Sequence, residues 1–265
     1  MITLLMTLGL LLGLQACEDV VDVDLATEDP RLVVEATAVQ RGHNAMGELR
    51  VILSKTAPYF QDSIPKVRQA KVSIRVNGEN ISLPESSKNP GVYQEQIPMI
   101  YAQDYTLHIE TEGQQYEGTT QLYPTVPILG VEQEEGIFDT EEVLLKVRYS
   151  DPGDTEDYYL FSYLSKHGKA LTITDDEQYN GNQVTTLYNE KFDPGDSLQI
   201  QIHGVGKNFY RYLSILLDQS DMTNNPFATA PTTVRGNMVN VEHPENFPLG
   251  YFRISQVFEY TYVIE

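Results

Sequence analysis

The chain is built from short segments in which apolar and polar residues alternate with a period of two, and this pattern constrains its fold most. Residues 71–76 (Lys-Val-Ser-Ile-Arg-Val) place their apolar side chains on one face, as a half-buried strand does. Asn77 and Gly78 follow and are the strongest short hairpin signal, because both positions of such a turn need a positive φ. Similar segments recur from residue 31 to the C-terminus. The pattern predicts an all-β protein.

Two β-sandwich domains, immunoglobulin-like or prealbumin-like, are the expected architecture. Strand segments separated by turns fill residues 31–124, and Pro124 and Pro127 mark a boundary because each proline removes a backbone donor from a sheet. Residues 125–265 then form a second, β-rich domain. Its long last strand has apolar residues of one parity, with Gln256 as the exception: Phe252, Ile254, Phe258, Tyr260, Tyr262 and Ile264.

One amphipathic helix is predicted near residues 208–219, in the second domain. Its apolar residues are spaced by three and four positions, which places them on one helical face: Phe209, Tyr212, Leu213, Leu216 and Leu217. Asn208 is the expected N-cap. We expect this face to pack against a sheet.

The charge balance excludes two classes of partner. The chain has 38 acidic and 18 basic residues, which gives a formal net charge of −20. Binding to nucleic acid needs a basic face, and electrostatic docking to an anionic bilayer needs clusters of Lys and Arg. A single Cys also excludes an internal disulfide framework. We therefore expect no nucleic-acid partner.

The N-terminal residues 1–16 predict a signal peptide. They are uncharged and rich in Leu, and they are shorter than the ~20 residues that span a bilayer. Leu14-Gln15-Ala16-Cys17 follows at their end and resembles a bacterial lipobox. The resemblance implies cleavage between Ala16 and Cys17, a diacylglycerol group on the Cys17 thiol and acylation of the new amino terminus. The alternative is a plain secretory signal that leaves a free thiol.

Residues 17–30 form an acidic tether after the lipidated Cys. In Bacteroidota such acidic residues resemble a signal for export to the outer face of the outer membrane, and the alternative is a solvated linker. Two or more acyl chains hold a protein stably on a membrane, whereas one chain holds it only marginally. We expect the lipid bilayer to be a partner through Cys17, with the protein anchored in the outer membrane and exposed at the cell surface. The periplasmic face stays open as the second placement.

No catalytic constellation is found in the sequence. Motifs for serine hydrolases, zinc proteases and nucleotide phosphates are absent, and residues 204–207 (Gly-Val-Gly-Lys) read as a strand-to-helix turn. Residues 165–167 (Ser-Lys-His) read as a turn rather than a nucleophile cluster. The five His are dispersed without metal-ligand spacing. The sequence therefore predicts no enzyme, no cofactor and no metal.

Acidic loops leave one question open, which is whether they bind calcium. Asp151, Asp154, Glu156 and Asp157 lie in one predicted loop, and residues 175–177 lie in another. Asp193 and Asp196 lie in a third. Calcium takes six to eight oxygen ligands, but none of these loops matches the twelve-residue calcium-binding loop. Asp-Pro-Gly-Asp also suits a tight turn without a metal.

A weak modification signal is also present. The triplets at residues 62–64 and 196–198 (Asp-Ser-Ile and Asp-Ser-Leu) resemble the O-glycosylation signal that Bacteroidota use on exported proteins. Ser63, in a polar loop, is the better candidate of the two.

A family resemblance rests on several short motifs in order along the chain. They are the lipobox, residues 32–35 (Leu-Val-Val-Glu), 91–93 (Gly-Val-Tyr), 225–227 (Asn-Pro-Phe), 235–237 (Arg-Gly-Asn) and 249–252 (Leu-Gly-Tyr-Phe). Together they resemble an uncharacterised Bacteroidota lipoprotein family, catalogued as domain of unknown function number four thousand two hundred and forty-nine. The resemblance implies an envelope lipoprotein of a kind often encoded beside TonB-dependent receptors. Membership establishes no activity.

These observations predict a lipid-anchored outer-membrane protein that acts as a non-enzymatic binding or accessory subunit, with a TonB-dependent receptor as partner. Two alternatives stay open. The first is a stand-alone surface adhesin or structural lipoprotein. The second is a hydrolase of glycans or peptides that uses dispersed Asp, Glu or Ser.

Overall fold

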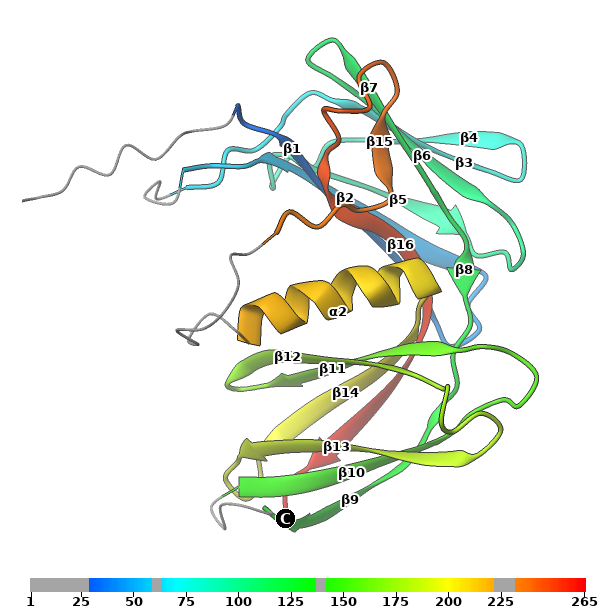
Figure 1. Cartoon of the computed structure of the whole chain (residues 1–265), viewed down its shortest axis with the longest axis vertical. Helices are drawn as coiled ribbons and strands as arrows, with labels where there is room; N and C mark the ends of the chain where they lie inside the picture. The colour runs from blue at the N-terminus through cyan, green and yellow to red at the C-terminus, as the bar shows by residue number, and fades with distance from the viewer. Residues whose placement is uncertain (1–28, 59–62, 137–141, 222–231) are drawn as a thin grey trace, which may run out of the picture.

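The computed structural model describes residues 29–58, 63–136, 142–221 and 232–265, and in these ranges the chain is almost entirely β, with one helix, α2 (Lys207–Asp221) (Figure 1). The predicted all-β class with two sandwiches and one amphipathic helix is confirmed. The lipobox with Ala16 and Cys17, and most of the tether, lie outside the described residues. No helix among the described residues is both long and apolar enough to cross a membrane.

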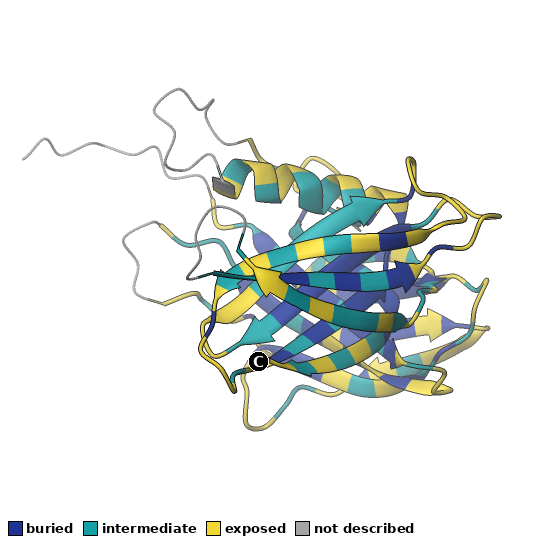
Figure 2. Cartoon of the chain, turned by 90° about the horizontal axis from the view of Figure 1, so that it is seen from below, coloured by how far each residue is buried: buried dark blue, intermediate teal, exposed yellow. Residues whose placement is uncertain are grey.

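The first sandwich packs a five-stranded sheet, in the order β15-β7-β6-β3-β4, against strands β16, β1, β2 and β5 of an eight-stranded sheet. Buried side chains alternate with more exposed ones along these strands, and the buried ones form one apolar core. Figure 2, in which the molecule is seen from below, shows the same alternation along the strands nearest the viewer. The strands are β1 (Leu32–Arg41), β2 (Met46–Lys55), β3 (Lys71–Val76), β4 (Glu79–Leu83), β5 (Val92–Pro98), β6 (Tyr105–Thr111), β7 (Gln114–Thr120), β8 (Leu122–Tyr123), β15 (Met238–Asn240) and β16 (Leu249–Val263).

The second sandwich packs a three-stranded sheet, β13-β10-β9, against strands β12, β11, β14 and β16 of the same eight-stranded sheet. Aromatic rings fill much of its core, with Tyr163 stacked on Tyr188 at 4.0 Å between ring centroids. Its remaining strands are β9 (Ile128–Glu135), β10 (Glu142–Ser150), β11 (Tyr158–Ser165), β12 (Gly168–Asp175), β13 (Gln183–Lys191) and β14 (Ser197–Gly204).

Strand β16 belongs to both sandwiches. Its first half pairs in parallel with β1, and its second half pairs antiparallel with β14. Phe252 and Ile254 are therefore buried in the first core, whereas Phe258 packs against the second. Figure 1 shows β16 running from the upper sandwich into the lower one, so one sheet continues through both.

This sharing changes the domain division expected at residues 124 and 125. Both β15 and the first half of β16 lie after that boundary in the chain, yet they pair with β7 and β1 of the first sandwich. The cause is long-range: the partner of β1 is the last strand, and no local turn signal announces a parallel pair. The first sandwich is completed only by the C-terminal segment.

Gln256, the one polar residue in the apolar parity of the last strand, lies where β16 passes between the sandwiches. Its side chain is buried, accepts a hydrogen bond from the backbone N–H of Thr125 (2.9 Å) and donates one to the carbonyl of Gly42 (2.6 Å). It therefore ties the inter-domain segment and the β1–β2 turn to the shared strand. Because both polar atoms of the buried Gln256 amide have hydrogen-bond partners, a polar side chain is tolerated at this apolar position.

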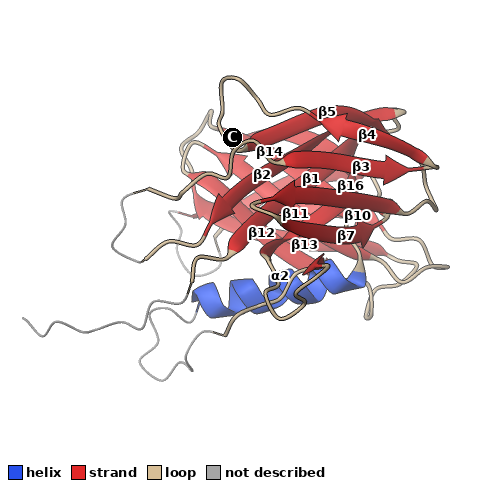
Figure 3. Cartoon of the chain, turned by 90° about the horizontal axis from the view of Figure 1, so that it is seen from above, coloured by secondary structure: helices blue, strands red, loops and turns tan. Residues whose placement is uncertain are grey.

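Helix α2 lies along one side of the strands (Figure 3) and buries its first turns most deeply. Phe209 is buried against Tyr158, Leu160 and Val205, and Tyr251 meets its ring edge-on. Leu216, on the predicted apolar face, is 36% exposed. The helix begins at Lys207, so Asn208, the expected N-cap, lies inside the first turn and Gly206 precedes the helix.

Candidate functional site

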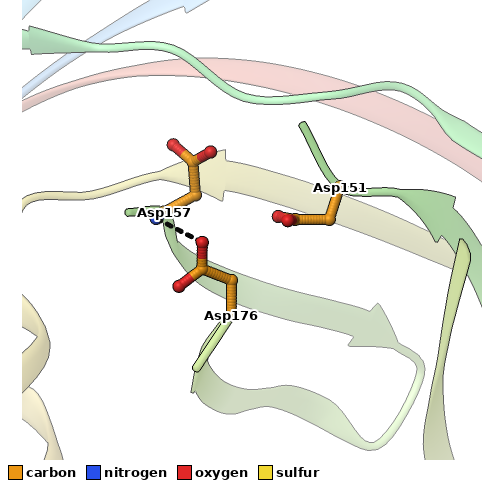
Figure 4. Close-up of side chains that lie close together, drawn as sticks. All are labelled: Asp151, Asp157 and Asp176. Atoms are coloured by element: carbon orange, nitrogen blue, oxygen red, sulfur yellow. Dashed lines mark hydrogen bonds between the residues drawn. The ribbon is translucent and has the colours of Figure 1, made fainter. Parts of the chain in front are cut away.

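Three carboxylates converge at one end of the second sandwich: Asp151, Asp157 and Asp176 (Figure 4). One oxygen atom from each lies within 4.8 Å of the others. Asp151 follows β10, Asp157 precedes β11 and Asp176 follows β12. β11 and β12 are antiparallel neighbours in the eight-stranded sheet, and β10 lies in the three-stranded sheet of the same sandwich. The connections β10–β11 and β12–β13, which join the two sheets, therefore supply one cluster.

Asp151 fixes the two connections to each other. It is buried, and its Oδ1 accepts a hydrogen bond from the hydroxyl of Tyr159 (2.6 Å) while its Oδ2 accepts one from the backbone N–H of Gly181 (3.1 Å). Gly181 has φ +77°, and a Cβ added at Gly153 would lie 3.1 Å from the Gly181 Cα. The close approach of the two loops therefore requires glycine at these positions.

Asp157 and Asp176 are held by backbone and hydroxyl groups. The backbone N–H of Asp157 donates to Asp176 Oδ2 (2.9 Å), and the backbone N–H of Asp176 donates to the carbonyl of Asp157 (3.2 Å). The hydroxyl of Thr155 donates to Asp157 Oδ2 (2.6 Å). Neutral donors thus hold these acids in place.

The surroundings of Asp157 favour the protonated form of this one carboxyl. Burial raises the pKa of Asp157, the hydrogen bond from Thr155 opposes this, and the charges of Asp151 and Asp176 raise the pKa further. Burial likewise raises the pKa of Tyr159, and its hydrogen bond to Asp151 adds to the effect. Tyr159 therefore stays a neutral donor to Asp151 throughout the physiological range.

The cluster has two chemical capacities. Carboxylates this close can share a proton, and they can supply oxygen ligands to a hard cation. Calcium takes six to eight oxygens, and both oxygens of Asp151 already accept hydrogen bonds. The cluster by itself therefore does not define a calcium site.

The structure regroups the acidic residues considered from sequence. Asp151 and Asp157 are brought together with Asp176, whereas Asp154 is exposed and Glu156 forms an ion pair with Lys207 (2.6 Å). The sequence placed Asp176 in a separate loop. The strand pairing β11–β12 is the signal that would have joined them.

The other sequence candidates lie apart from this cluster. In the third acidic loop, Asp193 and Asp196 both contact Lys166 (2.5 and 2.9 Å). The hydroxyl of Ser165 accepts a hydrogen bond from the backbone N–H of His167, so residues 165–167 form the expected turn. Ser63 is exposed in the segment after β2.

A shallow cavity of about 520 Å³ adjoins the cluster beside the start of α2. Its walls carry both charge signs: Glu156, Asp175 and Asp176 on the loops and Lys207 and Arg211 on the helix. The second sandwich therefore meets the start of α2 at a polar surface of mixed charge rather than at an apolar cleft.

Comparison of the whole sequence with family models decides its membership. The model described as Domain of unknown function (DUF4249) matches residues 18–261. The chain belongs to the DUF4249 family. The family expected from the order of short motifs is thereby confirmed. Comparison of this DUF4249 chain with curated proteins finds no match.

Solved structures similar to this DUF4249 member include a cytokine receptor complex, a fibronectin type-III segment and a butyrophilin. A cytokine receptor complex is 10% identical with a TM-score of 0.28, over 68% of this chain and 86% of that one. A two-domain fibronectin type-III segment of chicken tenascin is 14% identical with a TM-score of 0.22, over 67% and 91%. Bovine butyrophilin is 12% identical with a TM-score of 0.22, over 66% and 92%. Scores this low carry no argument, so the fold is established by the chain's own sheets.

Proposed function

We propose that this DUF4249 chain is a lipid-anchored outer-membrane lipoprotein that acts as a non-enzymatic binding subunit of a TonB-dependent receptor. The observation that carries the proposal is the lipobox ending at Cys17, followed at once by acidic residues. A body with a net charge of −20 is repelled by an anionic bilayer, so covalent acyl chains supply the attachment.

The side of the molecule on which β1 begins supports an outward-facing role for the acidic loops. About 15 residues separate Cys17 from β1, and an extended chain of this length reaches roughly 50 Å. The N-terminal end of β1 and the C-terminal end of α2 lie on one side of the molecule, and the connections β10–β11 and β12–β13 lie on the opposite side (Figure 1). An anchor at Cys17 would then present the aspartate cluster away from the membrane.

The cluster itself favours binding over catalysis. Asp151 is locked by Tyr159 and Gly181, so its oxygens are occupied rather than poised on a substrate. Loops held this firmly at the end of a sandwich suit recognition of a partner surface. A stand-alone adhesin or structural lipoprotein would share the anchor and the fold but would need no receptor.

The experiment compares the native chain and the variant Cys17→Ala, each with a C-terminal affinity tag, in the same bacterial host. Radiolabelled palmitate, membrane fractionation and protease treatment of whole cells report acylation, anchoring and exposure. The proposal expects the native chain to be labelled, anchored and cleaved from outside. It expects the variant to be soluble, unlabelled and folded.

Purification of the anchored chain after chemical crosslinking tests the partner. A TonB-dependent receptor should be recovered with the native chain and lost with Cys17→Ala. Anchoring without any receptor would favour the stand-alone lipoprotein. An unlabelled native chain would contradict the whole proposal.

A further inference from the structure

A small pocket lies at the junction of the two sandwiches, where β7, β8, the start of α2 and β16 meet. Its volume is about 70 Å³. Its polar lining includes Thr120, Tyr123, Asn208 and Arg253. Arg253 is the one charged residue in the lining, and no carboxylate contributes to it. That composition is unusual in a chain with 38 acidic and 18 basic residues.

Arg253 meets neutral groups in the pocket. Its Nη1 donates a hydrogen bond to Ser255 Oγ (3.0 Å), and its guanidinium lies 5.4 Å from the ring centroid of Phe209. It keeps some accessible surface, yet burial lowers its pKa to about 10, and no carboxylate acts to raise it. Burial lowers the pKa of Lys169, and the positive charge of Arg253 lowers it further, so Arg253 has an interaction with a charge of its own sign. A buried charge of this kind is costly unless an opposite charge meets it.

The start of α2 adds backbone donors to the same pocket. The first helical hydrogen bond runs from the N–H of Tyr210 to the carbonyl of Gly206 (3.0 Å), so the N–H groups of residues 207–209 precede the helical ladder. Gly206 has no side chain with which to cap them, and the first turn contains no acidic residue. The nearest described carboxylate, Glu156, is paired with the Lys207 side chain (2.6 Å) on the side of the helix that faces the larger cavity, and no carboxylate lines the junction pocket.

We propose that this junction pocket binds a tetrahedral oxyanion, a phosphate or a sulfate, between the Arg253 guanidinium and the first-turn N–H groups of α2. A water molecule takes a share of about 30 Å³ in the liquid, so the pocket has room for one small oxyanion rather than for a larger ligand. A guanidinium and a helix N-terminus are the two groups that proteins use most readily for such oxyanions. Because the walls come from both sandwiches, the bound ion would brace the junction.

The test measures binding and thermal stability of the full chain without its signal peptide. Sodium phosphate is titrated at constant ionic strength set with sodium chloride, and glycerol phosphate is titrated in parallel to distinguish a free ion from a phosphate ester. We expect saturable binding and a rise in Tm with inorganic phosphate. A response to glycerol phosphate alone would assign the site to an ester, and a response to neither would overturn the proposal.

Two variants locate the site. Arg253→Gln should weaken phosphate binding at least tenfold. Asn208→Asp places a carboxylate at the exposed first turn of α2, so it should raise the Tm without phosphate and abolish the response to phosphate.

Asn80→Asp is the matched control, because it adds the same charge at an exposed position of β4. It should keep the native phosphate response. If Arg253→Gln fails to fold, Asn208→Asp still tests whether phosphate binds in the junction pocket. An unchanged phosphate response in Asn208→Asp would overturn the proposal.

Discussion

The side chain of Asn237 pairs with both backbone polar groups of Phe252. Its Oδ1 accepts a hydrogen bond from the Phe252 N–H (2.8 Å), and its Nδ2 donates one to the Phe252 carbonyl (2.8 Å). One amide thereby acts as a strand partner for β16 and ties the segment before β15 to the shared strand. This places the five-stranded sheet against the eight-stranded sheet of the first sandwich.

Replacing Asn237 with Ala should therefore destabilise the protein. The change removes two hydrogen bonds to partly buried backbone groups, at roughly 1 kcal/mol each, so we expect a loss of about 2 kcal/mol in the free energy of unfolding. Urea denaturation measures it. Asn80→Ala, at an exposed position, is the control and should change the stability little. Equal effects of the two changes would show that the Asn237 pairing contributes nothing.

Gly250 is required where β16 meets β1. Its φ is +89°, and an added Cβ would lie 2.1 Å from the carbonyl oxygen of Val34. Gly250→Ala should cost on the order of 3 kcal/mol or more, because both the backbone strain and the clash oppose it. Gly78→Ala is the matched control, with φ +81° and open space around the added methyl group, and it should cost only about 1 kcal/mol. Thermal unfolding of the two variants should separate them clearly, and equal Tm values would contradict the register of β1 and β16.

The aspartate cluster predicts an unusual pH dependence. The folded-state pKa of Asp157 is raised above its ordinary value of 3.8, mainly by burial, so the folded state holds this proton more tightly than the unfolded state does. Its contribution to stability therefore rises as the pH falls through the raised pKa toward 3.8, and it is lost as the pH rises. Asn at this position keeps an oxygen for the hydroxyl of Thr155 and removes the titration.

The measurement compares the free energy of unfolding of the native chain and Asp157→Asn across that pH range. We expect the free energy of unfolding of the native chain to rise relative to that of the variant toward low pH, and to be the lower of the two at neutral pH. Carboxylates with lowered pKa values, such as Glu85, lose their contribution to stability as the pH falls. This loss is the same in both chains, so the comparison cancels it. A stability difference that does not change with pH would mean that the Asp157 proton is not coupled to folding.

Local sequence patterns predicted the local structure well. The hairpin expected at residues 77 and 78 has positive φ at both positions, 49° and 81°. Phe209 and Tyr212, whose spacing predicted a helix, lie in α2. Both features depend only on neighbours along the chain. Gly204 and Lys207 likewise lie at the end of a strand and at the start of a helix, as the sequence indicated.

Long-range arrangements were not predictable from the same patterns. The parallel pairing of β1 with β16 joins the first strand to the last, and no turn signal reports it. The meeting of Asp151 with Asp176 depends on how two loops fold over strand ends, which period-two alternation does not specify. The exact start of the helix was also not predictable. The helix begins one residue earlier than expected, at Lys207, so Asn208 lies in its first turn and is not the N-cap.

The intact mass of the protein extracted from the membranes of its host tests the central claim most directly. The account predicts a chain that begins at Cys17 and carries a diacylglycerol group and an added acyl chain on that residue. A chain that retains residues 1–16, or one that begins at Cys17 with an unmodified thiol and amino terminus, would contradict it.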